Sequence, residues 1–187
     1  MNLPNSLTLM RIIIIPVFVL VFYLPFNWSN LVACLLFSIA ALTDLLDGYL
    51  ARRLGQTSRL GAFLDPVADK LMVAVVLVLL VQRHPALYLA LPAAVIIGRE
   101  ITISALREWM AELGARSKVA VSIFGKIKTV TQMIALIFLI YAHAVFGLPI
   151  YAIGMLLLYV AVILTLWSMF EYLYSAWPKL LESVYKQ

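Results

Sequence analysis

The sequence predicts an all-α integral membrane protein, a six-transmembrane-helix bundle with a short N-terminal interfacial segment. Hydrophobic residues make up 65% of the 187 residues, and charged residues only 12%. This balance is typical of membrane spans rather than of a soluble core. The apolar residues gather in runs of about 20, the length at which a helix crosses the hydrocarbon core of a bilayer. We expect residues 1–187 to form one membrane domain.

Proline, glycine and other turn-forming residues interrupt the apolar runs. In chain order, the breaks fall at residues 24–27, 55–58, 84–85, 114–117 and 146–149. They leave six expected spans, at residues 7–25, 30–52, 60–82, 86–107, 118–142 and 149–174. Tandem repeats and low-complexity segments are absent from the sequence.

The residues ahead of the first span, with Pro4 among polar neighbours, predict the interfacial segment. Arg11 lies early in the first apolar run. Its guanidinium can either face the bundle interior or extend along the helix toward lipid headgroups, and the sequence leaves both orientations open.

Loop charges predict the orientation in the membrane. Basic residues gather in or beside the second and fourth connections, at Arg52, Arg53, Arg59, Arg107, Arg116 and Lys118. The first and fifth connections carry no Lys or Arg, and the third has only Arg83. The positive-inside rule therefore puts both termini and the even-numbered connections in the cytoplasm. The net charge of +5 reflects this topology and attraction to anionic headgroups better than nucleic-acid binding.

Four aspartates interrupt the second and third apolar runs. Asp44 and Asp47 are three apart, and Asp65 and Asp69 are four apart, so each pair shares one helix face. A carboxylate in a membrane helix costs roughly 2.5–3.5 kcal/mol, which implies a compensating cation. The short connection makes the two helices antiparallel neighbours, so their acidic faces can meet across one cavity. Such oxygen ligands suit Mg²⁺ or Mn²⁺, and we expect two ions.

Nearby residues fit a phosphate-bearing ligand. Gly48 and Gly61 leave space for a ligand or a neighbouring backbone, and Arg52 offers a planar donor fork for phosphate oxygens. The aspartates could instead cap helix ends or pair with nearby cations, namely Arg52, Arg53, Arg59 and Lys70. Repetition at face-sharing spacing on two spans favours the metal interpretation.

The segment from Asp44 to Asp69 matches every specified position of the pattern D-x-x-D-G-x-x-A-R-x8-G-x-x-x-D-x-x-x-D. In this it resembles the CDP-alcohol phosphotransferase family, and the long, position-specific pattern makes the resemblance strong. The resemblance implies metal binding by Asp44, Asp47 and Asp65, and metal binding, general-base catalysis or both by Asp69. It implies contacts with the cytidine nucleotide for Gly48, Ala51, Arg52 and Gly61.

Three further segments, residues 3–11, 98–109 and 125–129, resemble one group of bacterial members of this family. Those members transfer the phosphatidyl group from CDP-diacylglycerol to sn-glycerol 3-phosphate, giving phosphatidylglycerophosphate and CMP in anionic phospholipid synthesis. The resemblance implies the same two substrates and a homodimer. It also implies a multi-pass protein of the bacterial inner membrane with a cytoplasmic active site.

The acceptor is a dianion, so its site needs cations beyond those of the metal cluster. Candidates for the acceptor phosphate are Arg99, Arg107, Lys126 and Lys128. Lys126 and Lys128 are two residues apart and cannot share a regular helix face, so we expect one of them to meet the phosphate. Alternatively, Arg99 pairs with Glu100 and the lysines extend to the membrane surface.

The charges suggest a mechanism. An attacking hydroxyl must approach a negatively charged diphosphate, which bound metal can neutralise, and Asp69 could take the hydroxyl proton. A cavity open both to lipid and to cytoplasm would let acyl chains stay in the bilayer. A cation transporter also places acids in spans, but it needs a path across the membrane, whereas these acids cluster toward one leaflet. Another acceptor, such as serine or inositol phosphate, is the alternative within the enzyme class.

Overall fold

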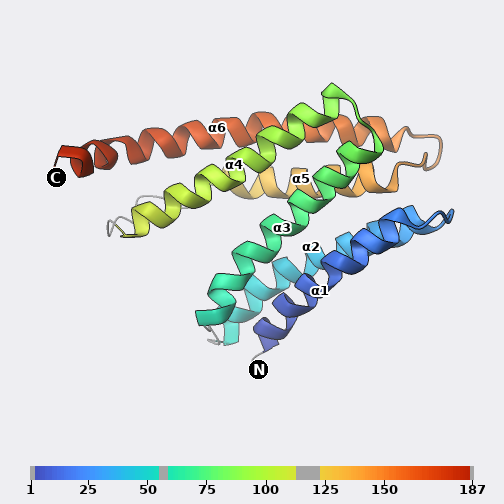
Figure 1. Ribbon diagram of the computed structural model, residues 1–187, viewed down its shortest axis with the longest axis horizontal. Coiled ribbons are helices and arrows are strands. Elements are labelled where there is room, and N and C mark those ends of the chain that lie inside the picture. Colours follow the sequence, from blue (N-terminus) through green and yellow to red (C-terminus); the bar gives the residue numbers. More distant parts are fainter. Residues whose placement is uncertain (1–2, 55–58, 113–122, 186–187) are drawn as a thin grey trace.

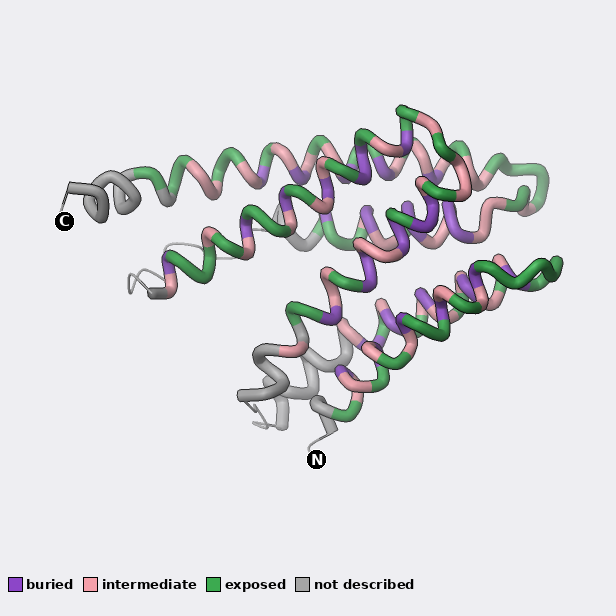
Figure 2. Tube along the Cα trace, viewed as in Figure 1, coloured by how far each residue is buried: buried purple, intermediate pink, exposed green. Residues whose placement is uncertain are grey.

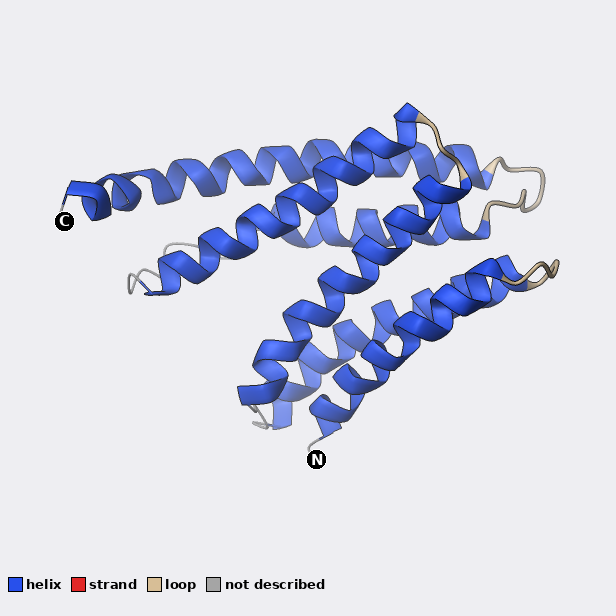
Figure 3. Cartoon of the chain, viewed as in Figure 1, coloured by secondary structure: helices blue, strands red, loops and turns tan. Residues whose placement is uncertain are grey.

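The computed structural model describes residues 3–54, 59–112 and 123–185. Within these ranges, side chains are described except at 3–5, 45–54, 59–63, 65, 112, 123–126, 176 and 178–185. The described chain forms helices joined by loops, without a named strand (Figure 3). The helices are α1 Leu3–Tyr23, α2 Ser29–Leu54, α3 Arg59–Arg83, α4 Leu87–Glu112, α5 Ile123–Tyr141 and α6 Ile150–Tyr185. The predicted all-helical class is therefore confirmed.

Each helix lies on one of the six expected spans, but some ends differ: α4 ends at Glu112, five residues past the expected end at 107. α1 begins at Leu3, so the N-terminal polar residues form the first turns of the helix that carries the first apolar run. α6 continues to Tyr185, eleven residues past the expected end at 174. Hydropathy marks where apolar sequence stops, but a helix can continue into the polar interface as long as the following residues favour a helical backbone.

Three stretches are long and apolar enough to cross a membrane: Ser6–Tyr23, Leu87–Ala111 and Ile150–Ser175. Shorter apolar stretches occupy α2 at Ser29–Asp44 and α5 at Ile127–Tyr141. Charged residues near one end of α2, α3 and α5 shorten their apolar portions. A count of six crossings therefore remains a prediction from the sequence.

The helices converge at one end of the molecule and diverge at the other (Figure 1). The loops after α1, α3 and α5 lie at the convergent end, while the start of α1 and the far ends of α2, α4 and α6 point away from it. α1 packs on α2 and α3, α2 packs on α5, and α6 packs on α4 and α5. This alternation agrees with the predicted topology, in which odd-numbered and even-numbered connections lie on opposite sides.

The apolar core fills the space where the helices converge (Figure 2). Fully buried members come from every helix and include Phe18, Phe37, Leu77, Leu89, Leu136 and Leu158. Large apolar side chains also cover the outer surface, as expected where lipid replaces water. Gly154 marks a close α5–α6 approach, since an added Cβ would lie 2.9 Å from the Cβ of Phe138 and 3.2 Å from the Ala135 carbonyl oxygen.

Arg83 ties three helices together at the convergent end. Its guanidinium donates hydrogen bonds of 2.7 Å to Asn30 Oδ1 and 2.7 Å to the Phe22 carbonyl oxygen. It also lies 3.7 Å above the centre of the Phe22 ring. A cation held by neutral groups and an aromatic face secures α1, α2 and α3 without using a carboxylate.

Candidate functional site

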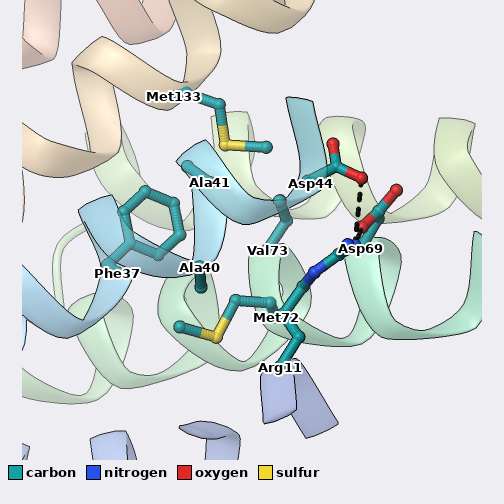
Figure 4. A pocket seen from close by; sticks show the side chains of 9 residues that line it. All are labelled: Arg11, Phe37, Ala40, Ala41, Asp44, Asp69, Met72, Val73 and Met133. Atoms are coloured by element: carbon teal, nitrogen blue, oxygen red, sulfur yellow. Dashed lines mark hydrogen bonds and ion pairs between the residues drawn. The ribbon is translucent and has the colours of Figure 1, made fainter. Parts of the chain in front are cut away.

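One guanidinium joins the two acidic helices. Arg11 Nη1 from α1 lies 3.0 Å from Asp44 Oδ1 on α2 and also donates to Asp69 Oδ1 on α3 (Figure 4). The Arg11 side chain is 1% exposed, whereas Asp44 and Asp69 remain partly accessible at 29% and 34%. The expected meeting of the two acidic faces is therefore present at Asp44 and Asp69, with an arginine from a third helix between them.

Arg11 is the site residue whose role the sequence left open. It faces the bundle interior because it lies on the buried stripe of α1, at face-sharing spacing with Thr8, Ile15, Phe18 and Phe22. The spacing of these residues in the sequence could have indicated that Arg11 faces inward, since Arg11 is the one charged residue among them. Hydropathy alone did not show which face α1 turns toward α2 and α3.

A cavity of about 320 Å³ extends from the carboxylate pair toward α4 and α5. Its lining residues are Asp44, Pro66, Asp69, Lys70, Val73, Glu100, Arg107, Lys128, Thr129, Gln132 and Met133. Two of the four predicted metal-binding aspartates and two of the predicted acceptor cations thus share one cavity. Its polar side chains lie on four helices, while Val73 and Met133 add apolar wall.

Toward α4 and α5, two basic side chains share one carboxylate, that of Glu100. Glu100 Oε1 accepts a hydrogen bond from Lys128 Nζ at 2.8 Å and another from Arg99 Nη1 at 2.8 Å. Arg99 is 8% exposed and donates a further bond of 3.0 Å to Ser168 Oγ on α6. Lys128 lines the cavity, whereas Arg99 lies behind Glu100 and does not. The pairing of Arg99 with Glu100 is the alternative that the sequence analysis considered for this residue.

Two further cations line the cavity. Arg107 is exposed, donates a 2.7 Å hydrogen bond to the Tyr172 hydroxyl and lies 5.1 Å from the centre of that ring. Lys70, next to Asp69 on α3, donates to Ser104 Oγ on α4. Arg107 thus borders the cavity from solvent, and Lys70 lies where α3 faces α4.

Several predicted site residues lie outside the described side chains. They are Asp47, Gly48, Ala51 and Arg52 on α2, Gly61 and Asp65 on α3, and Lys126 on α5. Their helical backbone keeps Asp47 one turn from Asp44 and Asp65 one turn from Asp69. Among the described residues, no group of three or more acidic, histidine or cysteine side chains gathers as a metal cluster.

The described pair still fits part of a divalent cation site. A single guanidinium nitrogen contacts both Asp44 and Asp69, so one small cation can reach oxygens from both helices. Hard carboxylate oxygens are the ligands that Mg²⁺ and Mn²⁺ prefer.

A second cavity of about 320 Å³ lies between α3 and α4 and shares Lys70, Val73 and Glu100 with the first. The rest of its lining is aliphatic, and its exposed members are Val67, Leu71 and Ile101. An apolar pocket therefore adjoins the polar one on the outer surface of the bundle.

The fold and site together define a helical membrane protein with an acidic pair and a set of cations around one polar cavity. The chain belongs to the CDP-alcohol phosphatidyltransferase family, whose description matches residues 1–167. Three relatives each carry the name CDP-diacylglycerol–glycerol-3-phosphate 3-phosphatidyltransferase.

The relative from Sodalis glossinidius is 56% identical, with 97% of this chain and 98% of the relative covered. The relative from Pseudomonas fluorescens is 57% identical, with 96% and 92% covered. The relative from Shigella flexneri is 54% identical, with 97% and 98% covered. Similarity at this level spans almost the whole of each chain.

Proposed function

We propose that this protein transfers the phosphatidyl group from CDP-diacylglycerol to sn-glycerol 3-phosphate, producing phosphatidylglycerophosphate and CMP. The observation that carries this proposal is the single cavity lined by Asp44 and Asp69 on one side and Lys128 and Arg107 on the other. The reaction brings together a diphosphate, which needs metal and carboxylate chemistry, and a phosphate dianion, which needs basic side chains. The printed names of the relatives describe the same transfer.

Asp44, Asp47, Asp65 and Asp69 would hold Mg²⁺ or Mn²⁺, with two ions expected. The bound ions would neutralise the diphosphate oxygens and stabilise the departing CMP. Support comes from the meeting of Asp44 and Asp69 at one cation and from the helical register of Asp47 and Asp65. Metal dependence is part of the proposal.

The acceptor hydroxyl would attack the β-phosphorus of the lipid. The new P–O bond forms as the bond to the bridging oxygen breaks, and CMP leaves with that electron pair. Asp69 takes the hydroxyl proton because its carboxylate lines the cavity from which the acceptor approaches. A metal-ligand role for the same carboxylate is compatible with this assignment.

For the acceptor phosphate, Lys128 and Arg107 are the cations that line the cavity. Arg99 would act from behind by holding Glu100 beside Lys128. Lys126 remains the alternative to Lys128. Lys128 already has Glu100 as its partner, so the acceptor phosphate would have to compete with that carboxylate for the ammonium group.

The cytidine nucleotide is assigned to Gly48, Ala51, Arg52 and Gly61. The acyl chains would remain in lipid beside the apolar cavity between α3 and α4, which adjoins the polar cavity at Lys70 and Glu100. We further propose a homodimer in the bacterial cytoplasmic membrane, with both termini and the active site on the cytoplasmic side. Support for this orientation comes from the basic residues in or beside the second and fourth connections, which include Arg52 and Arg53 near the end of α2 and Arg59 at the start of α3.

The decisive experiment is a transfer assay with the purified protein in lipid–detergent micelles. CDP-diacylglycerol and sn-glycerol 3-phosphate should yield one CMP per phosphatidylglycerophosphate, and chelation of divalent cations should stop both. Asp65→Asn should nearly abolish turnover while the protein remains folded. Preferred transfer to serine or inositol phosphate in acceptor competition would overturn the acceptor assignment, and full activity in the presence of a chelator would overturn the metal assignment.

A further inference from the structure

Arg11 is a charged side chain held in a mostly apolar setting. Its guanidinium meets Asp44 and Asp69 beside Phe37, Met72 and Met133 (Figure 4). In surroundings of low polarity, neither a guanidinium nor a carboxylate pair is stable without an opposite charge. Arg11 therefore neutralises part of the acidic pair and fixes the spacing of α2 and α3 around it.

The contacts of Arg11 use the oxygens that a bridging metal would need. Nη1 approaches Oδ1 of both Asp44 and Asp69. A divalent cation bound by both carboxylates at the usual distance of about 2.1 Å would lie close to the same nitrogen. Two cations that close repel each other strongly in a partly buried site. The guanidinium and a metal bridging this pair are therefore alternative counterions.

We propose that Arg11 releases Asp44 and Asp69 when the divalent cation binds them, and that its guanidinium then donates hydrogen bonds to phosphate oxygens of the CDP-lipid. This inference rests on the proposed metal site. A displaced guanidinium needs a new anion in an apolar site, and the lipid diphosphate supplies one with geometry that suits a planar donor fork. Metal binding and CDP-lipid binding are thereby coupled. The metal takes the two carboxylates from Arg11, and the lipid diphosphate supplies the anion that the freed guanidinium then needs.

A purely structural ion pair makes a different prediction. In that case Arg11 keeps both carboxylates whether or not metal is bound, and removing it destabilises the protein equally under both conditions. In the exchange arrangement, removing Arg11 destabilises the protein without metal but also removes a competitor for metal. The two arrangements are therefore distinguished by whether the destabilisation caused by removing Arg11 depends on the presence of metal.

The test measures thermal unfolding and Mn²⁺ affinity of the full-length protein in micelles, with chelator and with Mn²⁺. Arg11→Met keeps an unbranched, flexible stem and removes the charged guanidinium group. It should unfold at a lower temperature in chelator, show a larger stabilisation by Mn²⁺ than the wild type, and bind Mn²⁺ roughly tenfold more tightly, the change expected when one charged competitor is lost. Arg11→Lys should lie between the two. If Arg11→Met folds only with Mn²⁺, the exchange is also supported.

Arg83→Met is the matched control, because Arg83 is a helix-joining arginine at the opposite end with no carboxylate among its hydrogen-bond partners. It should lower the unfolding temperature equally with and without Mn²⁺. A wild-type Mn²⁺ affinity and stabilisation in both Arg11 variants would overturn the exchange and leave the metal site intact. A wild-type protein that does not respond to Mn²⁺ would instead overturn the metal site, and the exchange with it.

Discussion

Glu100 is predicted to be the main stabilising carboxylate between α4 and α5. Glu100→Gln preserves size and one oxygen acceptor but removes the negative charge that Arg99 and Lys128 share, so both cations keep a hydrogen bond and lose their ionic partner. Removing one partner of a buried ion pair costs about 3–5 kcal/mol, and the two hydrogen bonds that the amide oxygen retains offset about 1 kcal/mol each. Glu100 is 26% exposed, and solvent moderates the loss.

We therefore expect Glu100→Gln to lower the free energy of unfolding by about 2 kcal/mol, or the melting temperature by roughly 4–8 °C on the scale of a soluble protein of similar length. Differential scanning calorimetry in micelles measures the change in melting temperature. Glu108→Gln is the control, because Glu108 is an exposed glutamate on the same helix. A double-mutant cycle with Lys128→Met should return a coupling of about 1 kcal/mol. A loss below about 0.5 kcal/mol, equal to that of Glu108→Gln, would refute the assignment.

Three other outcomes test the site and the packing. Asp69→Asn should lose most turnover while retaining saturable dependence on sn-glycerol 3-phosphate, measured by steady-state kinetics; unchanged kcat would remove Asp69 as the proton acceptor. Arg107→Ala should raise KM for the acceptor by roughly threefold to tenfold with kcat little changed, because an exposed cation attracts the anion without contacting the reacting atoms; an effect on the CDP-lipid alone would contradict this. Gly154→Ala should destabilise the fold by about 1–3 kcal/mol through its contact with Phe138, and a neutral effect in thermal unfolding would show that α5 and α6 can separate there at little cost.

Much of the helical architecture was predictable because lipid makes one demand on every span, that its backbone be hydrogen-bonded within the helix. Apolar runs of the right length then locate the helices, and α2 and α3 fall within a few residues of their expected spans. The end of α6 was not predictable in this way. Its last turns leave the apolar run, so hydropathy no longer reports where the helix stops.

The acidic side of the site followed from local rules. Asp44 and Asp69 both contact Arg11, whose helix α1 packs on α2 and on α3, and helical spacing fixes which faces of those helices carry the acids. The identity of their counterion depends on how α1 packs against both helices. That is a long-range choice, and a sequence pattern that describes one helix at a time does not contain it.

The roles of the basic residues were even less predictable from the sequence. Arg99 was expected in the acceptor site because it is a cation in an apolar run, but helix periodicity does not decide between a ligand and a neighbouring carboxylate. The structure gives it Glu100 and Ser168, and leaves Lys128 and Arg107 on the cavity wall. Side-chain partners contributed by three helices determine this arrangement, and their relative rotation emerges only on packing.

The polar cavity also has an electrical property that follows from its lining. The charged residues described there are three acids, Asp44, Asp69 and Glu100, and three bases, Lys70, Arg107 and Lys128. The total formal charge of these six side chains is zero, and opposite charges are interleaved: Lys70 follows Asp69 on α3, Arg107 shares α4 with Glu100, and Lys128 on α5 contacts Glu100. Such an interleaved lining distinguishes ligands by how their charge is distributed and oriented more than by how much they carry. A polyanion that presents one sign of charge in every direction gains little there, whereas a ligand with a complementary arrangement of charges is favoured.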